Sequence, residues 1–405
     1  MTKIGIVGQG YVGLPLAVAF ASEGFNVTGF DIDVSRVSQL NSGISPIEDI
    51  ESQDLNELII QGNYLASSRP TDISDCNVVI IAVPTPLNRL REPDLSFVIA
   101  ASEMIGEVLT QDSLIINEST SFPGTLRDVI APTVTKKSLP GVEHTFAVSP
   151  ERVDPGNLIW KISNTPRLIA GLTQDATLMT RKLYGQICEN IIEVSRPEVA
   201  EAAKLFENTF RQVNIALVNE FATIMNALEI PTNEVLDAAN TKPYGFMKFS
   251  PGLGVGGHCI PVDPSYLAFV ASKAGVQPRF IELANEVNLH MPAAIVGIVK
   301  AENGGSLKGK SILICGVSYK PNIADTRETP ARVLITELEA EGATVAWHDP
   351  VVESWNGQNS VSLDQTKYDA TIITLHHGIF DYQAILNSSD YVFDCLGRIA
   401  GTHTL

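Results

Sequence analysis

The first 120 residues alternate short apolar runs with amphipathic stretches of helical spacing. Buried strands are predicted at KIGIVG, NVTGFDI, NVVIIAVP and SLIINEST, and HTFAVSPE and PRLIAGL are expected to extend the same sheet. Strands that alternate with helices are typical of a parallel sheet with helices on both faces. The pattern therefore predicts an N-terminal Rossmann domain.

A long helical pattern follows, from Pro197 to about Leu228. Proline suits the first turn of a helix, and Pro231 lies just past the expected end. Apolar residues recur on one face at Phe206, Phe210, Val213, Leu217 and Phe221. At 1.5 Å per residue the helix would be roughly 45–50 Å long, enough for a spine between two domains. Helices of this kind often also form symmetric dimer contacts.

Strand-like runs return in SILICGVSY, ATVAWHDP, YDATIITLHH and YVFDCLG, and TPARVLITELEAEG is predicted to be a helix after the first of them. These runs predict a second, smaller α/β unit. A chain of 405 residues favours two or three domains. The expected fold class is α/β, with an N-terminal Rossmann domain (1–196), a central helical domain with the long helix (197–300) and a C-terminal Rossmann-like domain (301–405).

Composition narrows the partners. The net charge of -18 makes nucleic acid an unfavourable partner, although a small anionic ligand held by local cations remains compatible with it. No apolar run reaches the ~18–20 residues of a membrane span, and the N-terminus enters a strand without a signal peptide. The cysteines are scattered, at Cys76, Cys188, Cys259, Cys315 and Cys395. Their number and spacing predict reduced thiols in a cytoplasmic protein and no metal site.

The segment GQGYVG places Gly8, Gly10 and Gly13 in the G-x-G-x-x-G pattern, after a strand and at the start of a helix. The three glycines would allow a tight turn, the approach of a pyrophosphate and close helix–strand packing, with Tyr11 and Val12 inside the loop. Asp31 ends the second strand, where a carboxylate binds the adenosine ribose and repels the 2′-phosphate of NADP. The loop therefore predicts NAD. Arg36 either lies along the adenine or is solvated.

Three further sites follow predicted strands. AVPTP contains Thr85 and NEST contains Ser119 and Thr120, at strand ends where α/β sheets bind ligands. Each is either a nicotinamide contact or a simple loop start. CGVSYKPN has Gly316 but lacks the other two glycines, so a second dinucleotide is not expected there. A smaller anionic group, with Lys320 and Arg327 as its charge partners, stays open.

The segment GLGVGGHCIPVDPSYL puts Cys259 after a glycine-rich loop, four residues before Asp263. Either the thiol is packing, or the glycines allow a ligand to approach a reactive sulfur. The long helix carries Lys204, Asn208 and Arg211 at i, i+4 and i+7; this face is either solvated or able to stabilise an oxyanion. An NAD site with a reactive thiol predicts oxidation of an alcohol to an acid through an aldehyde and a thioester.

These motifs together resemble the UDP-glucose/GDP-mannose dehydrogenase family. The resemblance rests on GYVGLPLA, AVPTP, SPERVDPG, KLFENTFRQVNIALVNE, GVGGHCIPVDP and GVSYKPNIADTRETP, in the family's order over nearly the whole chain. The resemblance implies a cytoplasmic nucleotide-sugar 6-dehydrogenase that uses two NAD and no metal. It also implies a dimer through the central helix and a C-terminal domain that holds the UDP of the substrate.

The resemblance implies a role for individual residues. Cys259 would be the nucleophile, with Lys204 and Asn208 on the oxyanion, Asp263 and Thr120 on the water and proton relay, and Glu151 assisting thioester hydrolysis. Arg327 would contact the cofactor. The substrate would be contacted by Glu151, Arg152, Val153, Lys204, Asn208, Arg211, Phe249, Gly252, Leu253, Gly256 and Lys320.

Three positions depart from the UDP-glucose members. Arg152 replaces an aromatic residue, Pro155 replaces a second glutamate and Val262 replaces a lysine. These forms resemble the branch that acts on UDP-N-acetylglucosamine or UDP-N-acetylmannosamine, and GYVGLPLA and GISPIEDI incline the prediction to the GlcNAc sugar. The acid would supply a surface polysaccharide. The alternatives are a UDP-glucose 6-dehydrogenase and a one-step NAD-dependent hydroxyacid dehydrogenase, in which Cys259 would have no role.

Overall fold

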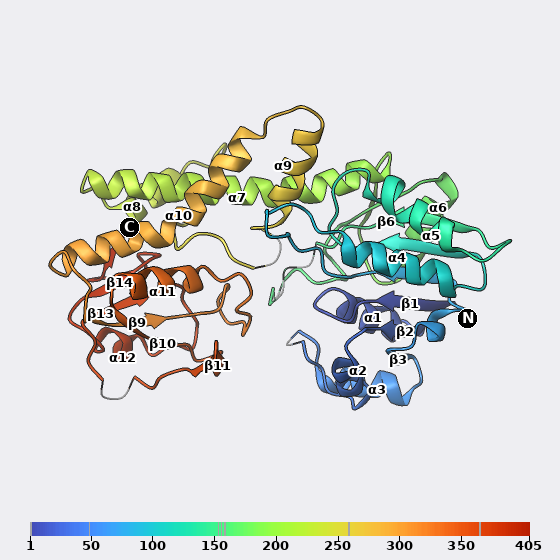
Figure 1. The fold of residues 1–405 in the computed structure, drawn as a ribbon, viewed down its shortest axis with the longest axis horizontal. Coiled ribbons are helices and arrows are strands. Elements are labelled where there is room, and N and C mark those ends of the chain that lie inside the picture. The colour runs from blue at the N-terminus through green and yellow to red at the C-terminus, as the bar shows by residue number, and fades with distance from the viewer. Residues whose placement is uncertain are drawn as a thin grey trace. The chain divides into compact units, whose positions relative to one another are not determined.

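The computed structural model describes residues 2–47, 49–152, 154, 156–157, 159–257, 260–363 and 366–405. The chain forms two compact units, whose elements are labelled in Figure 1. Unit 1 comprises Met1–Glu207 and Ser265–Ala274, and unit 2 comprises Asn208–Pro264 and Gly275–Leu405. The division into three domains at 196 and 300 stays a prediction.

Unit 1 is built on a sheet with the strand order β3-β2-β1-β4-β5-β6-β7-β8. The strands are β1 Lys3–Val7, β2 Asn26–Phe30, β3 Tyr64–Ser67, β4 Val78–Ile81, β5 Ser113–Asn117, β6 His144–Val148, β7 Arg167–Gly171 and β8 Ile191–Glu193. Neighbouring strands are parallel except β6 and β7, which pair antiparallel. The six predicted strands are confirmed, whereas β3, β8 and the reversal at β7 were not predicted.

Helices cover both faces of this sheet, as the alternating pattern predicts. They are α1 Gly13–Ser22, α2 Val34–Asn41, α3 Ser52–Ile60, α4 Ser96–Val108, α5 Ala131–Lys137 and α6 Gln174–Tyr184, with the 3₁₀ turn η1 Pro70–Ile73 and the π-helical turn η2 Leu126–Ile130. Helices α1, α2, α3 and α6 share one buried core with the sheet, and α4, η2 and α5 share the other. The strands alternate their side chains between these two cores, which fixes their register.

Unit 2 contains a smaller parallel sheet with the order β10-β9-β13-β14-β15. Its strands are β9 Ser311–Cys315, β10 Thr344–His348, β13 Ala370–Ile373, β14 Val392–Asp394 and β15 His403–Thr404, beside a hairpin of β11 Ser354–Trp355 and β12 Gln358–Asn359. The helices are α8 Thr232–Asn240, α10 Arg279–Glu302, α11 Pro330–Ala340 and α12 Tyr382–Leu386, and α9 Asp263–Lys273 begins in unit 2 and continues in unit 1. The second α/β unit is confirmed.

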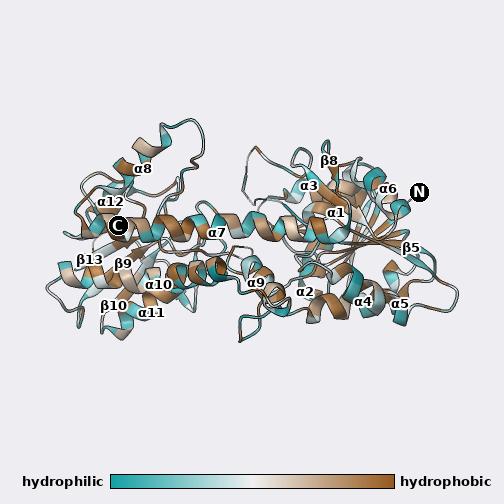
Figure 2. Cartoon of the chain, turned by 90° about the horizontal axis from the view of Figure 1, so that it is seen from above, coloured by the Kyte–Doolittle hydropathy of each residue, from teal (hydrophilic) through white to brown (hydrophobic). Residues whose placement is uncertain are grey.

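The long helix α7 runs over Pro197–Ala227, close to the predicted bounds, and passes from unit 1 into unit 2. Hydrophobic and hydrophilic residues alternate along it in Figure 2. Leu205, Ala216 and Ala222 are buried. By contrast, Phe206 and Leu217 on the predicted apolar face are 64% and 62% exposed. Within the single chain the helix therefore buries one side and leaves part of the predicted apolar face exposed.

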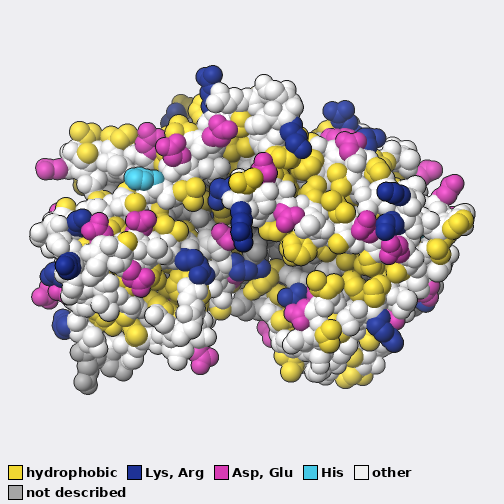
Figure 3. All heavy atoms as spheres, in the orientation of Figure 1, with side chains coloured by type: hydrophobic (Ala, Val, Ile, Leu, Met, Phe, Trp, Pro, Cys, Tyr) yellow, Lys and Arg dark blue, Asp and Glu magenta, His cyan; other side chains and the backbone are white. Residues whose placement is uncertain are grey.

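The hydrophobicity of the helices and the charges on the surface agree with what the composition of the sequence predicts. Within the described residues, every helix is too short or too polar to cross a membrane. Acidic and basic side chains are interspersed on the faces of both units that Figure 3 displays.

Candidate active site

The glycine loop after β1 has the geometry that its spacing predicts. Gly8 has φ +96°, and a Cβ there would stand 2.4 Å from the carbonyl oxygen of Ala82. A Cβ on Gly13 would stand 1.8 Å from the carbonyl oxygen of Gly8, so the turn closes tightly onto the start of α1. At Gly10 a Cβ would meet only open space. The loop therefore packs closely on the protein side and leaves room where a pyrophosphate would approach the helix.

Asp31 lies directly beside this loop. Its carboxylate is 5% exposed and accepts the backbone N–H groups of Gln9 at 2.8 Å and of Asp33 at 2.9 Å. Arg36 is held there too, because its Nη1 lies 2.9 Å from Oδ2 of Asp31. The carboxylate is thus fixed at the end of β2, where the ribose of an NAD would lie, and these residues fit that cofactor.

The other two loop residues of the motif support the turn. Val12 is the N-cap residue of α1, and Tyr11 packs against the core under that helix.

The loops that follow β4 and β5 are joined to each other. The hydroxyl of Ser119 accepts the N–H of Val83 at 2.9 Å and donates to its carbonyl oxygen at 2.8 Å. Thr85 and Thr120, one in each loop, are both half-buried. The two predicted nicotinamide contacts therefore lie on loops that are held as one piece.

Lys204 and Glu151 form a buried ion pair in unit 1. Nζ of Lys204 lies 3.6 Å from Oε2 of Glu151, and the two side chains are 8% and 9% exposed. Burial of either charge alone would be costly, so each stabilises the other. The pair joins α7 to the segment after β6 and brings together two of the predicted catalytic residues.

Arg152 is fixed from both sides. Its guanidinium donates to both carboxylate oxygens of Glu207, at 2.6 and 3.2 Å, and to the carbonyl oxygen of Pro166 at 2.7 Å. This bidentate geometry fixes the guanidinium of Arg152 in one position. The predicted contact at Val153 lies outside the described residues.

Asn208 and Asp263 meet in unit 2. Nδ2 of Asn208 donates to Oδ2 of Asp263 at 2.5 Å, and Asp263, the first residue of α9, is 1% exposed. One N–H of the Asn208 amide is thus committed to this carboxylate. Arg211, one turn further along α7, is exposed. The nucleophile predicted at Cys259 lies outside the described residues.

The glycines before Cys259 make room for protein atoms. A Cβ on Gly254 would stand 2.6 Å from the carbonyl oxygen of Asn288, and one on Gly257 would stand 2.6 Å from the ring of Tyr319. A Cβ on Gly256 would meet Pro330 and Glu328 at 2.9 and 3.0 Å. Close packing within unit 2 thus accounts for these three glycines.

The rest of the predicted substrate loop is anchored as well. The N–H of Gly252 donates to Asn219 on α7 at 2.9 Å, and a Cβ on Gly252 would meet open space. The ring of Phe249 lies 6.1 Å from that of Phe210, and Leu253 is 5% exposed in the core of unit 2. Gly252 is therefore the glycine of this loop that a ligand could approach closely.

The loop after β9 carries the two predicted charge partners of unit 2. Gly316 has φ +98°, and its Cβ would stand 2.7 Å from Leu375. Arg327 makes a bidentate pair with Asp325, whose oxygens lie 2.8 and 2.9 Å from Nε. Lys320 is half-buried in the same loop. Nε2 of the buried His377 lies 3.1 Å from Oδ2 of the buried Asp349. The same carboxylate oxygen accepts the N–H of Val317, which fixes the start of the loop.

Comparison with known proteins finds one matching family along almost the whole chain. The UDP-glucose/GDP-mannose dehydrogenase family matches with its NAD binding domain over residues 2–188, its central domain over 198–290 and its UDP binding domain over 313–399. The chain belongs to this family. It is an NAD-dependent nucleotide-sugar dehydrogenase, and the resemblance identified from the motifs is confirmed.

Individual relatives of this dehydrogenase span nearly its full length. It is 37% identical to the UDP-N-acetyl-D-glucosamine 6-dehydrogenase of Pseudomonas aeruginosa, over 93% of this chain and 91% of the relative. It is 34% identical to the UDP-N-acetyl-D-mannosamine dehydrogenase of Pyrococcus horikoshii, over 93% and 90%. A solved structure of a UDP-D-ManNAc dehydrogenase from Pyrococcus horikoshii superposes with a TM-score of 0.90 and 32% identity, covering 100% of this chain and 98% of that one.

Three residues of the dehydrogenase near Glu151 were not among the predicted site residues. Glu118 is fully buried, and its Oε1 lies 2.5 Å from Nη1 of Arg167. The hydroxyl of Tyr184 donates to the same carboxylate. Arg167 also donates to the hydroxyl of Ser149 at 3.1 Å, two residues before Glu151. A glutamate directly after the apolar run SLIIN is the signal that could have found them, because a buried charge requires a partner.

Proposed function

We propose that this dehydrogenase oxidises the C6 alcohol of a UDP-N-acetylhexosamine to the carboxylate, in two oxidations that each consume one NAD. The observation that carries the proposal is the likeness to two relatives that act, by name, on UDP-N-acetyl sugars, over more than nine-tenths of this chain. The fixed guanidinium of Arg152 supports it, since this residue replaces the aromatic side chain of the UDP-glucose members.

The cofactor would be held by the glycine loop, by Asp31 at the ribose and by the loops with Thr85 and Thr120. When bound, NAD supplies a hydride acceptor for C6. The N-terminal N–H groups of α1 bind and orient anionic phosphate, and the carboxylate of Asp31 disfavours a 2′-phosphate. We therefore assign the orientation of the cofactor to these residues of unit 1 and to Arg327.

The chain supplies the groups for carbon chemistry at C6. We assign the nucleophile to Cys259, whose thiolate adds to the aldehyde carbon to give a thiohemiacetal. The ammonium of Lys204 and the amide of Asn208 stabilise the negative oxygen at that carbon. Loss of a second hydride gives a thioester, and water cleaves it to release the carboxylic acid and return the thiol.

Water activation is assigned to the carboxylates. Asp263 accepts from Asn208, which orients it, and with Thr120 it holds the water and relays the proton. Glu151 assists hydrolysis while its charge is balanced by Lys204. In this assignment each oxyanion-stabilising residue of α7 is held by one of the carboxylates that handle the water.

We propose UDP-GlcNAc as the preferred sugar, ahead of UDP-ManNAc, and contacts from Arg152, Gly252 and Lys320 to the substrate. A panel of UDP-GlcNAc, UDP-ManNAc, UDP-glucose and GDP-mannose, read as NADH formation at equal concentrations, tests this directly. The highest kcat/KM is expected for UDP-GlcNAc and a measurable one for its epimer. A preference for UDP-glucose would contradict the assignment of the sugar. That the acid supplies a surface polysaccharide and that the protein is cytoplasmic both stay predictions.

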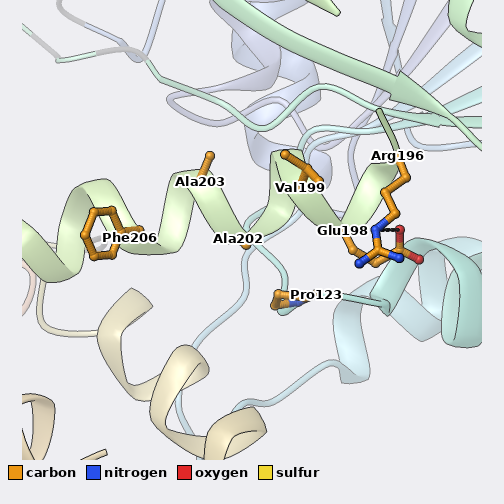
Figure 4. Close-up of a pocket in the computed structure, with 7 residues that line it drawn as sticks. All are labelled: Pro123, Arg196, Glu198, Val199, Ala202, Ala203 and Phe206. Atoms are coloured by element: carbon orange, nitrogen blue, oxygen red, sulfur yellow. Dashed lines mark ion pairs between the residues drawn. The ribbon is translucent and has the colours of Figure 1, made fainter. Parts of the chain in front are cut away.

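We further propose that the protein is a homodimer through α7. The helix presents an exposed apolar stripe at Val199, Phe206, Phe210, Leu217 and Ile224. In unit 1 the stripe borders a pocket of about 520 Å³ lined by Pro123, Arg196, Glu198, Val199, Ala202, Ala203 and Phe206 (Figure 4). A twofold interface would bury this stripe against its own copy, which removes apolar surface from water.

Replacing Phe206 with glutamate is expected to shift the protein from dimer to monomer, because each subunit would bury an unpaired carboxylate in the interface. Sedimentation velocity measures the change. Leu178 on α6 is 51% exposed and lies outside the stripe, so Leu178→Glu is the matched control and should stay dimeric. A dimer that survives Phe206→Glu would argue for another interface.

A further inference from the structure

The loop that carries Thr120 is held by one carboxylate of α7. Glu201 is 1% exposed, and its Oε2 accepts the N–H of Gly124 at 2.7 Å. Its Oε1 accepts the N–H of Leu126 at 3.0 Å and the hydroxyl of Ser121 at 3.2 Å. Two of these donors belong to the connection between β5 and η2, and Leu126 is the first residue of η2. A carboxylate, which only accepts, is the side chain that satisfies three converging donors.

The same contacts extend to the loop after β4. Nδ2 of Asn117 donates to the carbonyl oxygen of Ser119 at 3.0 Å and to the hydroxyl of Ser121 at 3.3 Å. Ser119 in turn exchanges two hydrogen bonds with the backbone of Val83. Thr120 therefore lies between two serines whose hydroxyls are both engaged, and the chain of hydrogen bonds ends on Glu201, three residues before Lys204.

We propose that Glu201 is a positioning residue for hydride transfer: its carboxylate fixes the two cofactor loops to the helix that bears Lys204. This inference rests on the proposed function, because it takes the loops of Thr85 and Thr120 as the nicotinamide contacts. Glu201 itself has all three of these contacts within the protein and acts through Thr120.

The charge state of Glu201 sets how well the loop is held. Burial raises the pKa of Glu201 to about 7, although the bonds from Leu126, Gly124 and Ser121 act to lower it. The negative charge of Glu198 on α7 also raises the pKa of Glu201. Arg127 of η2 is a nearby cation, and it pairs with Glu198. Above pH 7 the carboxylate accepts all three donors. Below pH 7 one oxygen carries a proton, so the group resembles a glutamine.

The test compares Glu201→Gln with the wild type in two measurements. The first is NADH binding to the full-length enzyme without sugar, and the second is kcat/KM for NAD. Both are made between pH 5.5 and 8.5, about one and a half pH units on either side of the pKa of Glu201. At pH 8.5 the variant should bind NADH about tenfold more weakly, since one backbone donor then faces an amide N–H₂. At pH 5.5 the two proteins should converge. Convergence at low pH is the result that a merely structural role of Glu201 does not produce.

Two further variants complete the design. Glu220→Gln changes an exposed glutamate on the same helix and should bind NADH as the wild type does. Ser121→Ala keeps Glu201 and removes one donor, so it should weaken NADH binding in the same direction, by a smaller factor. Should Glu201→Gln fail to fold, unchanged NADH binding by Ser121→Ala overturns the inference.

Unchanged NADH binding and an unchanged pH profile in Glu201→Gln also overturn it. The binding measurement contains no sugar. A protein that turned over no UDP-sugar but lost NADH affinity in Glu201→Gln would therefore refute the proposed function and leave the role of Glu201 standing.

Discussion

Replacing Cys259 with serine is expected to lower formation of the sugar acid by at least about 10³-fold. An alcohol is a far weaker nucleophile than a thiolate, and an ester is a poorer acyl donor to water than a thioester. The first oxidation needs no covalent bond to the chain, so the variant should still reduce at most one NAD per sugar. Separation of the sugar products by ion-exchange chromatography, together with NADH absorbance, measures both effects.

Cys188 provides the matched control for this substitution. It is buried in unit 1, and its Sγ lies 3.3 Å from the carbonyl oxygen of Thr165, so a serine hydroxyl finds an acceptor there. Cys188→Ser should form acid at the rate of the wild type. Normal acid formation by Cys259→Ser would instead contradict the thioester route, because the acid would then form without the thiol.

Replacing Lys204 with methionine is expected to lower kcat by about 10²–10³-fold, the cost of removing one oxyanion-stabilising group. The same change leaves Glu151 buried without its cation, which should lower the free energy of unfolding by about 3–5 kcal/mol. Steady-state kinetics and urea unfolding measure the two consequences on the same protein.

The double variant Lys204→Met/Glu151→Gln separates them. It removes both buried charges, so most of the lost stability should return. Its kcat should stay below that of Glu151→Gln alone, because only the double variant lacks the lysine, and a kcat equal to that of Glu151→Gln would mean that Lys204 acts only as the structural partner of Glu151.

The sheets were the part of the fold most accessible from sequence. Apolar runs such as VVII in β4 and SLIIN in β5 are buried on both faces of a parallel sheet, which makes them continuous and easy to recognise. β3 has only four residues, of which Leu65 is exposed and Ser67 is polar, and β8 is only three residues long. Their weak patterns explain why neither was predicted.

The antiparallel pairing of β7 could not have been predicted from its own residues. RLIAG is as apolar as the neighbouring strands, and its direction depends on the path of the connection from β6. This connection contains SPERVDPG, the segment with Glu151 and Arg152. The connection at which the strand direction reverses thus also bears these two predicted site residues.

The residue types predicted which side chains form the site better than they predicted which of these side chains pair with each other. Lys204 on a largely apolar helix implies a buried partner, and that partner proved to be Glu151. The pairs Asn208–Asp263 and Arg152–Glu207 join residues 55 apart in the chain, so only the fold reveals them. The glycines before Cys259 were predicted to clear space for a ligand, whereas at Gly254, Gly256 and Gly257 the close neighbours are protein atoms.

The central claim is that one active site carries an alcohol through to an acid. The most direct test is the ratio of NADH formed to UDP-N-acetylhexosamine consumed, measured to completion with limiting sugar and excess NAD. The account predicts two NADH per sugar and a carboxylate product. One NADH per sugar, with a carbonyl product that accumulates, would contradict it.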